Sequence, residues 1–229
     1  MSVISLFSVV QRLNTAKWLF VSLLSFSLLF PLYVHSDQGI DKQENVTKHK
    51  LLVLGDSLSA AYGLTENQGW VAILAKEWKT DKRPIEVVNA AISGDTTDGG
   101  LARLPRLLAL HSPSHLYIEL GGNNGLQGHN PKKIKNNLAK MIELAQTQGI
   151  AVILQEVQIP TNFGRRYTQM FIENYHQLAE EYAVPLVPFF LQDIALDASL
   201  MQRDGIHPTS EAQLLIVDFL KPKLEALIL

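Results

Sequence analysis

The sequence predicts an α/β fold, a three-layer α/β/α sandwich around a five-stranded parallel sheet of flavodoxin-like order 2-1-3-4-5. Short apolar runs typical of buried strands alternate along the chain with segments in which apolar residues recur every three or four positions. Because a helix that joins two parallel strands makes a right-handed crossover, this alternation favours a parallel sheet covered by helices on both faces. Residues 50–229 have a length suited to one such domain.

Residues 1–36 differ from the rest of the chain and predict a signal peptide. Arg12 and Lys17 are their only charged residues, and both precede the apolar run 18–34, which small residues follow. This pattern is typical of an exported protein, either periplasmic in a bacterium or secreted. The run is shorter than the roughly 20 residues of a membrane span, but an uncleaved anchor remains the alternative. The polar residues 37–49 predict a linker.

Charge and cysteine content exclude several functions. Without Arg12 and Lys17, 18 of the 20 basic residues remain against 22 acidic ones, a net charge of −4. A negative chain lacks the positive field that phosphate backbones require, so we expect no nucleic-acid partner. The absence of cysteine excludes disulfides, thiolate metal sites and a cysteine nucleophile. We expect no metal or cofactor, no stable membrane insertion once the signal is removed, and a monomer.

Five apolar runs predict the strands, at residues 51–54, 85–91, 115–120, 151–157 and 185–189. The first run is apolar at every position and leads directly into Gly55-Asp56-Ser57. An apolar run that ends in a turn signal predicts a strand buried on both faces. Ser57 therefore follows the end of a rigid, buried strand.

Four segments of helical periodicity predict helices near residues 70–78, 134–145, 171–182 and 212–220. A Thr-Glu-Asn-Gln sequence at 65–68 fits a capping box before the first helix. Asn130 and Pro131 fit a cap residue followed by a proline in the first turn of the second. The fourth segment closes the chain.

Polar, glycine-containing segments follow three of the strands, at residues 55–57, 89–97 and 119–125. Parallel strands end at the same edge of a sheet, so we expect these segments to converge. A hydroxyl held with little freedom at such an edge suits a nucleophile. The alternative is that Asp56 or Ser57 only caps the next turn and that the glycines only form tight turns. None of the three segments fits a phosphate-binding glycine pattern, so we expect no nucleotide site.

A fourth segment, residues 204–208, precedes the last helix and contains Asp204 and His207. A serine nucleophile needs a base within hydrogen-bond reach, and the base needs a group that fixes its tautomer. His207 and Asp204 supply both types of residue. The alternatives are that His207 only begins the helix before Pro208, or that the two residues hold a metal, although no second ligand cluster accompanies them.

Taken together, these segments resemble the SGNH, or GDSL, hydrolases, and most closely the bacterial periplasmic branch of acyl-CoA thioesterases, lysophospholipases and arylesterases. The resemblance covers nearly all of residues 50–229. It rests on six motifs: GDSLSAAYG (55–63), NAAISGDTTDGGLARLP (89–105), ELGGNNGL (119–126), FGRRY (163–167), PLVPFF (185–190) and MQRDGIHP (201–208).

The resemblance implies a serine hydrolase that cleaves acyl esters and thioesters without a cofactor. It implies Ser57 as nucleophile, His207 as general base and Asp204 as the group that orients the imidazole. The oxyanion hole would consist of the backbone N–H groups of Ser57 and Gly94 and the side-chain amide of Asn123, and an uncharged amide suits this task.

The resemblance also implies that Asn124, Gly125 and Leu126 border the substrate. Relatives usually carry an aspartate where this chain has Asn124, so we expect a change in substrate range while the catalytic residues are retained. Small-molecule esters, thioesters or lysophospholipids are the expected substrates. The alternatives are an esterase of the same fold that removes acetyl groups from carbohydrates, and a non-catalytic lipid- or glycan-binding module.

Overall fold

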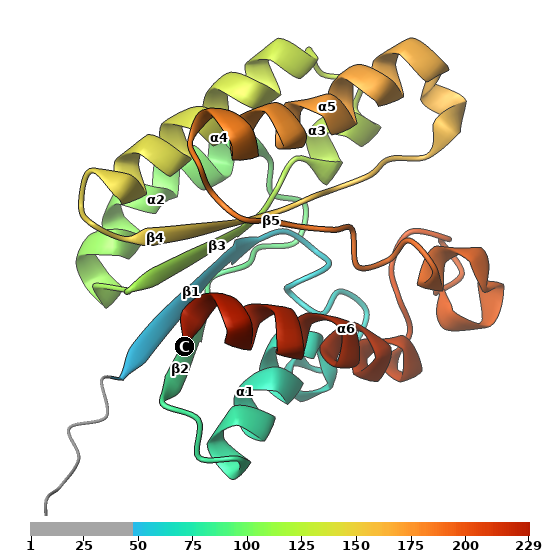
Figure 1. Ribbon diagram of the computed structural model, residues 1–229. Helices are drawn as coiled ribbons and strands as arrows, with labels where there is room; N and C mark the ends of the chain where they lie inside the picture. Colours follow the sequence, from blue (N-terminus) through green and yellow to red (C-terminus); the bar gives the residue numbers. More distant parts are fainter. Residues whose placement is uncertain (1–47) are drawn as a thin grey trace, which may run out of the picture. The chain divides into compact units, whose positions relative to one another are not determined.

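The computed structural model describes residues 48–229, in which five parallel strands form one sheet of order β2-β1-β3-β4-β5 (Figure 1). This order confirms the predicted fold. The strands are β1 (His49–Gly55), β2 (Ile85–Asn89), β3 (His115–Glu119), β4 (Ala151–Gln155) and β5 (Leu186–Val187). The predicted signal peptide, and the linker up to residue 47, lie outside the described residues.

All five strands differ in length from the prediction, and β1 and β5 differ most, by three residues each. β1 begins at His49, which pairs with Ile85 and donates its N–H to the Pro84 carbonyl over 2.7 Å, so the last residue assigned to the linker belongs to the sheet. β5 contains only two of the five residues predicted for it. The prolines on either side, Pro185 and Pro188, have no N–H to donate to a neighbouring strand, which limits β5 to this length.

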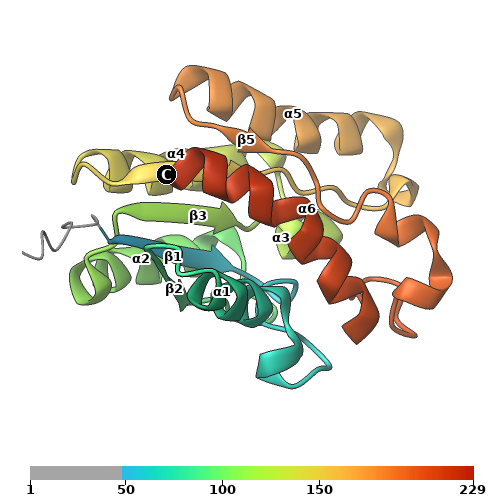
Figure 2. The same cartoon turned by 60° about the horizontal axis from the view of Figure 1, so that its bottom comes forward.

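Helices cover both faces of the sheet, as Figures 1 and 2 show. One face packs against α2 (Thr97–His111), α4 (Pro131–Gln146) and α5 (Arg165–Glu181), and the other against α1 (Trp70–Thr80) and α6 (Ser210–Ile228). Within β1, Leu52 and Leu54 join the first of these cores, while Leu51 and Val53 join the second. All four side chains are fully buried, so β1 is buried on both faces as predicted.

Two helices were not predicted from the sequence. α2 contains Gly99, Gly100 and Pro105, which disfavour a helix by intrinsic propensity. A Cβ at Gly100 would lie 2.3 Å from the Leu120 side chain, so the glycine lets α2 pack closely against the segment that follows β3. The second helix, α3 (Gly122–Leu126), is a single short turn inside the glycine-containing segment after β3. Tertiary packing outweighs propensity at both places.

The predicted helix starts are present. Asn130 caps α4 by accepting the Lys132 N–H over 2.9 Å, with Pro131 in the first turn. The capping box at Thr65 forms a short 3-10 turn (Glu66–Gln68), directly before α1. Among residues 48–229, no helix is both long enough and apolar enough to cross a membrane.

Candidate active site

Ser57 lies in a tight turn at the carboxyl end of β1. Asp56 accepts the Leu58 N–H with Oδ1 over 3.1 Å, and its carbonyl accepts the Ala60 N–H over 2.9 Å. These bonds show that Asp56 does cap the turn, as the simpler interpretation of this segment required. The same turn leaves Ser57 only partly buried at the sheet edge. Capping by Asp56 and presentation of Ser57 are therefore two results of one local structure.

The structure brings Ser57, His207 and Asp204 into one hydrogen-bonded chain. Ser57 Oγ lies 2.8 Å from His207 Nε2, and His207 Nδ1 lies 2.7 Å from Asp204 Oδ2. The histidine comes from the segment between β5 and α6, which the sheet topology returns to the edge where β1 ends (Figure 1). Residues 150 positions apart in the sequence thus meet with the geometry of a nucleophile, a base and an orienting carboxylate.

Asp204 is held in its ionised form. Its partial burial raises the pKa, but the hydrogen bonds from the His207 backbone N–H, the His207 ring and the Ile206 N–H outweigh that effect and lower the pKa to about 2. An ionised carboxylate only accepts hydrogen bonds, so the proton of the neutral imidazole belongs on Nδ1. Nε2 is then free to accept the hydroxyl proton of Ser57.

Three N–H groups proposed to bind an oxyanion lie on the segments after β1, β2 and β3. The backbone N–H groups of Ser57 and Gly94 have no acceptor among residues 48–229. Gly94 adopts a φ of 80°, which favours glycine at this position. The Asn123 amide nitrogen lies 2.8 Å from the Asp95 carbonyl and 3.2 Å from Asp56 Oδ2. These bonds hold its NH₂ group between the segment that carries Gly94 and the turn that carries Ser57.

Arg103 fixes this segment, although sequence analysis did not single it out. Its guanidinium donates to Asp95 Oδ2 over 2.8 Å, to the Gly55 carbonyl over 3.3 Å and to the Ala90 carbonyl. It therefore ties the end of β1 to both ends of the Gly94 segment. Arg103 belongs to one of the quoted motifs, but no spacing rule distinguishes such an arginine from an exposed residue of α2.

A pair of buried carboxyl groups lies beneath the Ser57 turn. Glu119 Oε2 accepts the Ser59 hydroxyl over 2.8 Å and the Asp56 N–H over 3.3 Å, while Oε1 has no partner in the described part of the chain. Burial is the main cause that raises the pKa of Asp56 to about 7 and that of Glu119 well above its usual range. A carboxyl group that stays protonated can hold the Ser57 turn through its hydrogen bonds without placing a negative charge in the protein interior.

This burial predicts a pH dependence of stability. The folded chain keeps protons on these carboxyls that the unfolded chain releases near pH 4, so the free energy of unfolding should fall as the pH rises toward about 7. The Glu119→Gln substitution removes one of the two ionisations. Unfolding free energies are measured with a chemical denaturant at pH 5 and pH 8. The variant should lose less stability than the wild type between these two pH values, and the gap should exceed the roughly 0.5 kcal/mol typical of surface substitutions. The matched control is Glu180→Gln at an exposed glutamate of α5. Equal pH dependence in all three proteins would contradict the prediction.

Two of the three residues expected to border the substrate are buried. Asn124 Oδ1 accepts the Thr97 N–H at the start of α2 over 2.8 Å, so its NH₂ group faces His129 Nδ1 at 3.0 Å. A Cβ added to Gly125 would lie 2.7 Å from the Ile159 side chain. Only Leu126 is partly exposed. Asn124 thus connects its own segment to the start of α2 and to His129. Because it is buried, it has no surface available for direct contact with a substrate.

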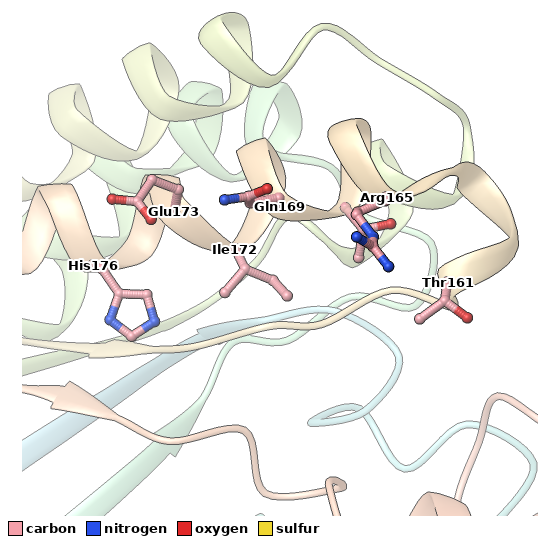
Figure 3. Close-up of a pocket in the computed structure, with 7 residues that line it drawn as sticks. Thr161, Arg165, Gln169, Ile172, Glu173 and His176 are labelled. Carbon is pink, nitrogen blue, oxygen red and sulfur yellow. The ribbon is translucent and has the colours of Figure 1, made fainter.

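A separate, open cavity of about 700 Å³ lies along α5 (Figure 3). Arg165, Glu173 and His176 are among its mostly polar lining residues. The residues that line it include none of those predicted for the active site.

The segments that meet at this edge of the sheet lie in a region that matches a known protein family. Residues 53–215 match the GDSL-like Lipase/Acylhydrolase family. The chain belongs to this family. The match confirms the predicted resemblance and, with it, that the protein is an ester hydrolase.

Individual proteins similar to this chain support the family assignment. The chain is 42% identical over 204 residues to an arylesterase of Vibrio mimicus, covering 89% of this chain and 98% of the relative. It is 42% identical over 178 residues to the thioesterase 1/protease 1/lysophospholipase L1 of Escherichia coli K12, covering 78% and 84%. The structure is similar to that of a psychrotrophic esterase from Pseudoalteromonas sp. inhibited by monoethylphosphonate, with a TM-score of 0.77, 40% identity and coverage of 78% and 98%.

Proposed function

We propose that the protein is an exported serine hydrolase of the arylesterase, thioesterase and lysophospholipase type, which cleaves acyl esters and thioesters through an acyl-enzyme on Ser57. The observation that carries the proposal is the 2.8 Å contact between Ser57 Oγ and His207 Nε2, together with the ionised Asp204 behind the ring. Export is supported by the pattern of residues 1–36.

In the first half of the reaction, Ser57 Oγ attacks the carbonyl carbon while His207 Nε2 takes its proton. His207 then returns this proton to the oxygen or sulfur of the departing alcohol or thiol, and the acyl group stays bonded to Ser57. In the second half, a water molecule takes the place of the alcohol, and His207 acts first as base and then as acid. Asp204 stabilises the imidazolium that forms in each half.

The negative charge that develops on the carbonyl oxygen requires fixed donors, each worth roughly 3–4 kcal/mol in related sites. The N–H groups of Ser57 and Gly94 supply two of them. We propose that Asn123 supplies the third. Its bond to the Asp95 carbonyl is the shorter one, so the hydrogen that faces Asp56 Oδ2 at 3.2 Å is the one available for the oxyanion.

The proposed substrates carry medium-to-long acyl chains on a small alcohol, a thiol or a lysophospholipid. The names of the relatives support this range, since two of them act as an arylesterase and as a thioesterase and lysophospholipase. The second candidate, an O-acetyl esterase for carbohydrates, uses the same catalytic residues and differs only in the acyl group that it accepts.

Two measurements test the proposal and separate the two candidates. We expect a fluorophosphonate probe to label the protein, with the adduct located on Ser57 by peptide mass spectrometry. Hydrolysis of acetyl, octanoyl and palmitoyl esters and thioesters of one alcohol or thiol should then be highest for octanoyl or palmitoyl. Activity confined to acetyl esters would favour the carbohydrate esterase. Failure of the probe to label Ser57 would favour the non-catalytic module.

A further inference from the structure

Tyr62 exposes an aromatic ring beside the base. Its ring centroid lies 4.3 Å from that of His207, the two planes are inclined by 35°, and half of the tyrosine remains exposed. Among residues 48–229, it is the aromatic side chain whose ring contacts His207. Tyr62 belongs to neither hydrophobic core, so packing of the domain does not account for an aromatic residue there.

The backbone fixes the place of this ring relative to both partners of the proton transfer. The Tyr62 N–H donates to the Ser57 carbonyl over 3.2 Å, and the Tyr62 carbonyl accepts from Gln202 Nε2 over 2.8 Å. Gln202 in turn donates its own N–H to the His207 carbonyl over 2.7 Å. Tyr62 is therefore tied to the Ser57 turn on one side and to the His207 segment on the other.

The proposed chemistry determines which part of the substrate passes this ring. The leaving oxygen or sulfur must come within hydrogen-bond reach, about 3 Å, of His207 Nε2 to receive the proton. The carbonyl oxygen must at the same time point to the N–H groups of Ser57, Gly94 and Asn123. The alcohol or thiol portion of the ester therefore leaves the reacting carbon along His207, where the exposed ring of Tyr62 lies.

We infer that Tyr62 is the surface on which the leaving group of the ester or thioester packs, and that it favours aryl over alkyl leaving groups. The inference rests on the proposed function and adds the residue that selects the alcohol or thiol. A flat, exposed aromatic ring packs well against another ring, whereas a short alkyl group covers little of it. Because Tyr62 contacts the leaving group and not the acyl chain, its effect belongs to formation of the acyl-enzyme.

The test compares phenyl butyrate with ethyl butyrate, which give the same acyl-enzyme. The ratio of their kcat/KM values is measured for each variant, so the higher intrinsic reactivity of the phenyl ester cancels when variants are compared. Tyr62→Ala should lower the phenyl-to-ethyl ratio about three- to tenfold, through a higher KM for the phenyl ester. Tyr62→Phe keeps the ring and should keep the ratio. Leu196→Ala, at an exposed apolar residue outside the site, is the control.

Each other result overturns the inference in a distinct way. An equal loss on both esters in Tyr62→Ala, with a changed pH profile, would show that Tyr62 only positions His207. An unchanged ratio would show that the leaving group does not touch the ring. Both results leave the proposed function intact. Absence of hydrolysis of either ester by the wild type, with Ser57 unlabelled by the fluorophosphonate, would overturn the proposed function and this inference with it.

Discussion

Replacement of Ser57 by alanine is expected to lower kcat/KM for an octanoyl p-nitrophenyl ester by roughly 10⁴- to 10⁶-fold, the range found when a serine nucleophile is removed. Among residues 48–229, Ser57 carries the hydroxyl that is hydrogen-bonded to His207. The neighbouring Ser59 is buried and donates to Glu119 over 2.8 Å. Residual activity would come from the N–H donors and from substrate binding alone.

The fold of the Ser57→Ala protein should be retained. The Ser57 side chain makes one hydrogen bond, to His207, and the turn that carries it is held by Asp56 and by backbone bonds. Circular dichroism and the thermal midpoint should therefore match those of the wild type within a few degrees. Ser199→Ala, at an exposed serine outside the site, is the matched control and should keep full activity. Ordinary turnover by a well-folded Ser57→Ala protein would refute the assignment of the nucleophile.

The sheet could be predicted because its signals are local. The all-apolar run before Gly55 and the periodic segments after it each follow from burial on one or two faces. α2 could not be predicted in this way, since Gly100 and Pro105 are signals against a helix. Gly100 is explained only by its close approach to Leu120, the residue just after β3, which no pattern within α2 contains.

The candidate site also contains residues that could be predicted from local patterns and residues that could not. Ser57, Asp204, His207, Gly94 and Asn123 were predicted because each belongs to a short motif, and the structure brings them to one edge of the sheet. Arg103, Glu119 and Tyr62 were not singled out. Their positions depend on contacts between distant segments, such as the bonds of Arg103 to the ends of β1 and β2. A single arginine, glutamate or tyrosine in a sequence does not reveal such contacts.

Asp204→Asn is expected to lower kcat/KM roughly 10³- to 10⁴-fold, although the two side chains have nearly the same shape. Asp204 Oδ1 accepts the backbone N–H groups of Ile206 and His207 over 2.9 and 3.0 Å. In the variant, these donors require the amide oxygen, so the NH₂ group must face His207 Nδ1. Nδ1 then has to accept, the proton of the neutral ring moves to Nε2, and Nε2 no longer accepts the proton of Ser57.

The wild-type pH profile tests the role of His207, and a matched control variant separates the tautomer effect from a loss of structure. The pKa of Asp204, about 2, keeps the carboxylate ionised from pH 4 to 8. A general base must be unprotonated to accept the Ser57 proton, so wild-type activity should fall on acidification. Asp197→Asn is the matched control, because Asp197 caps its own turn by accepting the Ser199 N–H over 2.9 Å outside the site. Full activity in Asp197→Asn beside a large loss in Asp204→Asn, with equal thermal midpoints, is the expected result. Comparable activity in both variants would mean that Asp204 does not set the tautomer of His207. A wild-type profile that is flat from pH 5 to 8 would mean that His207 does not act as the base.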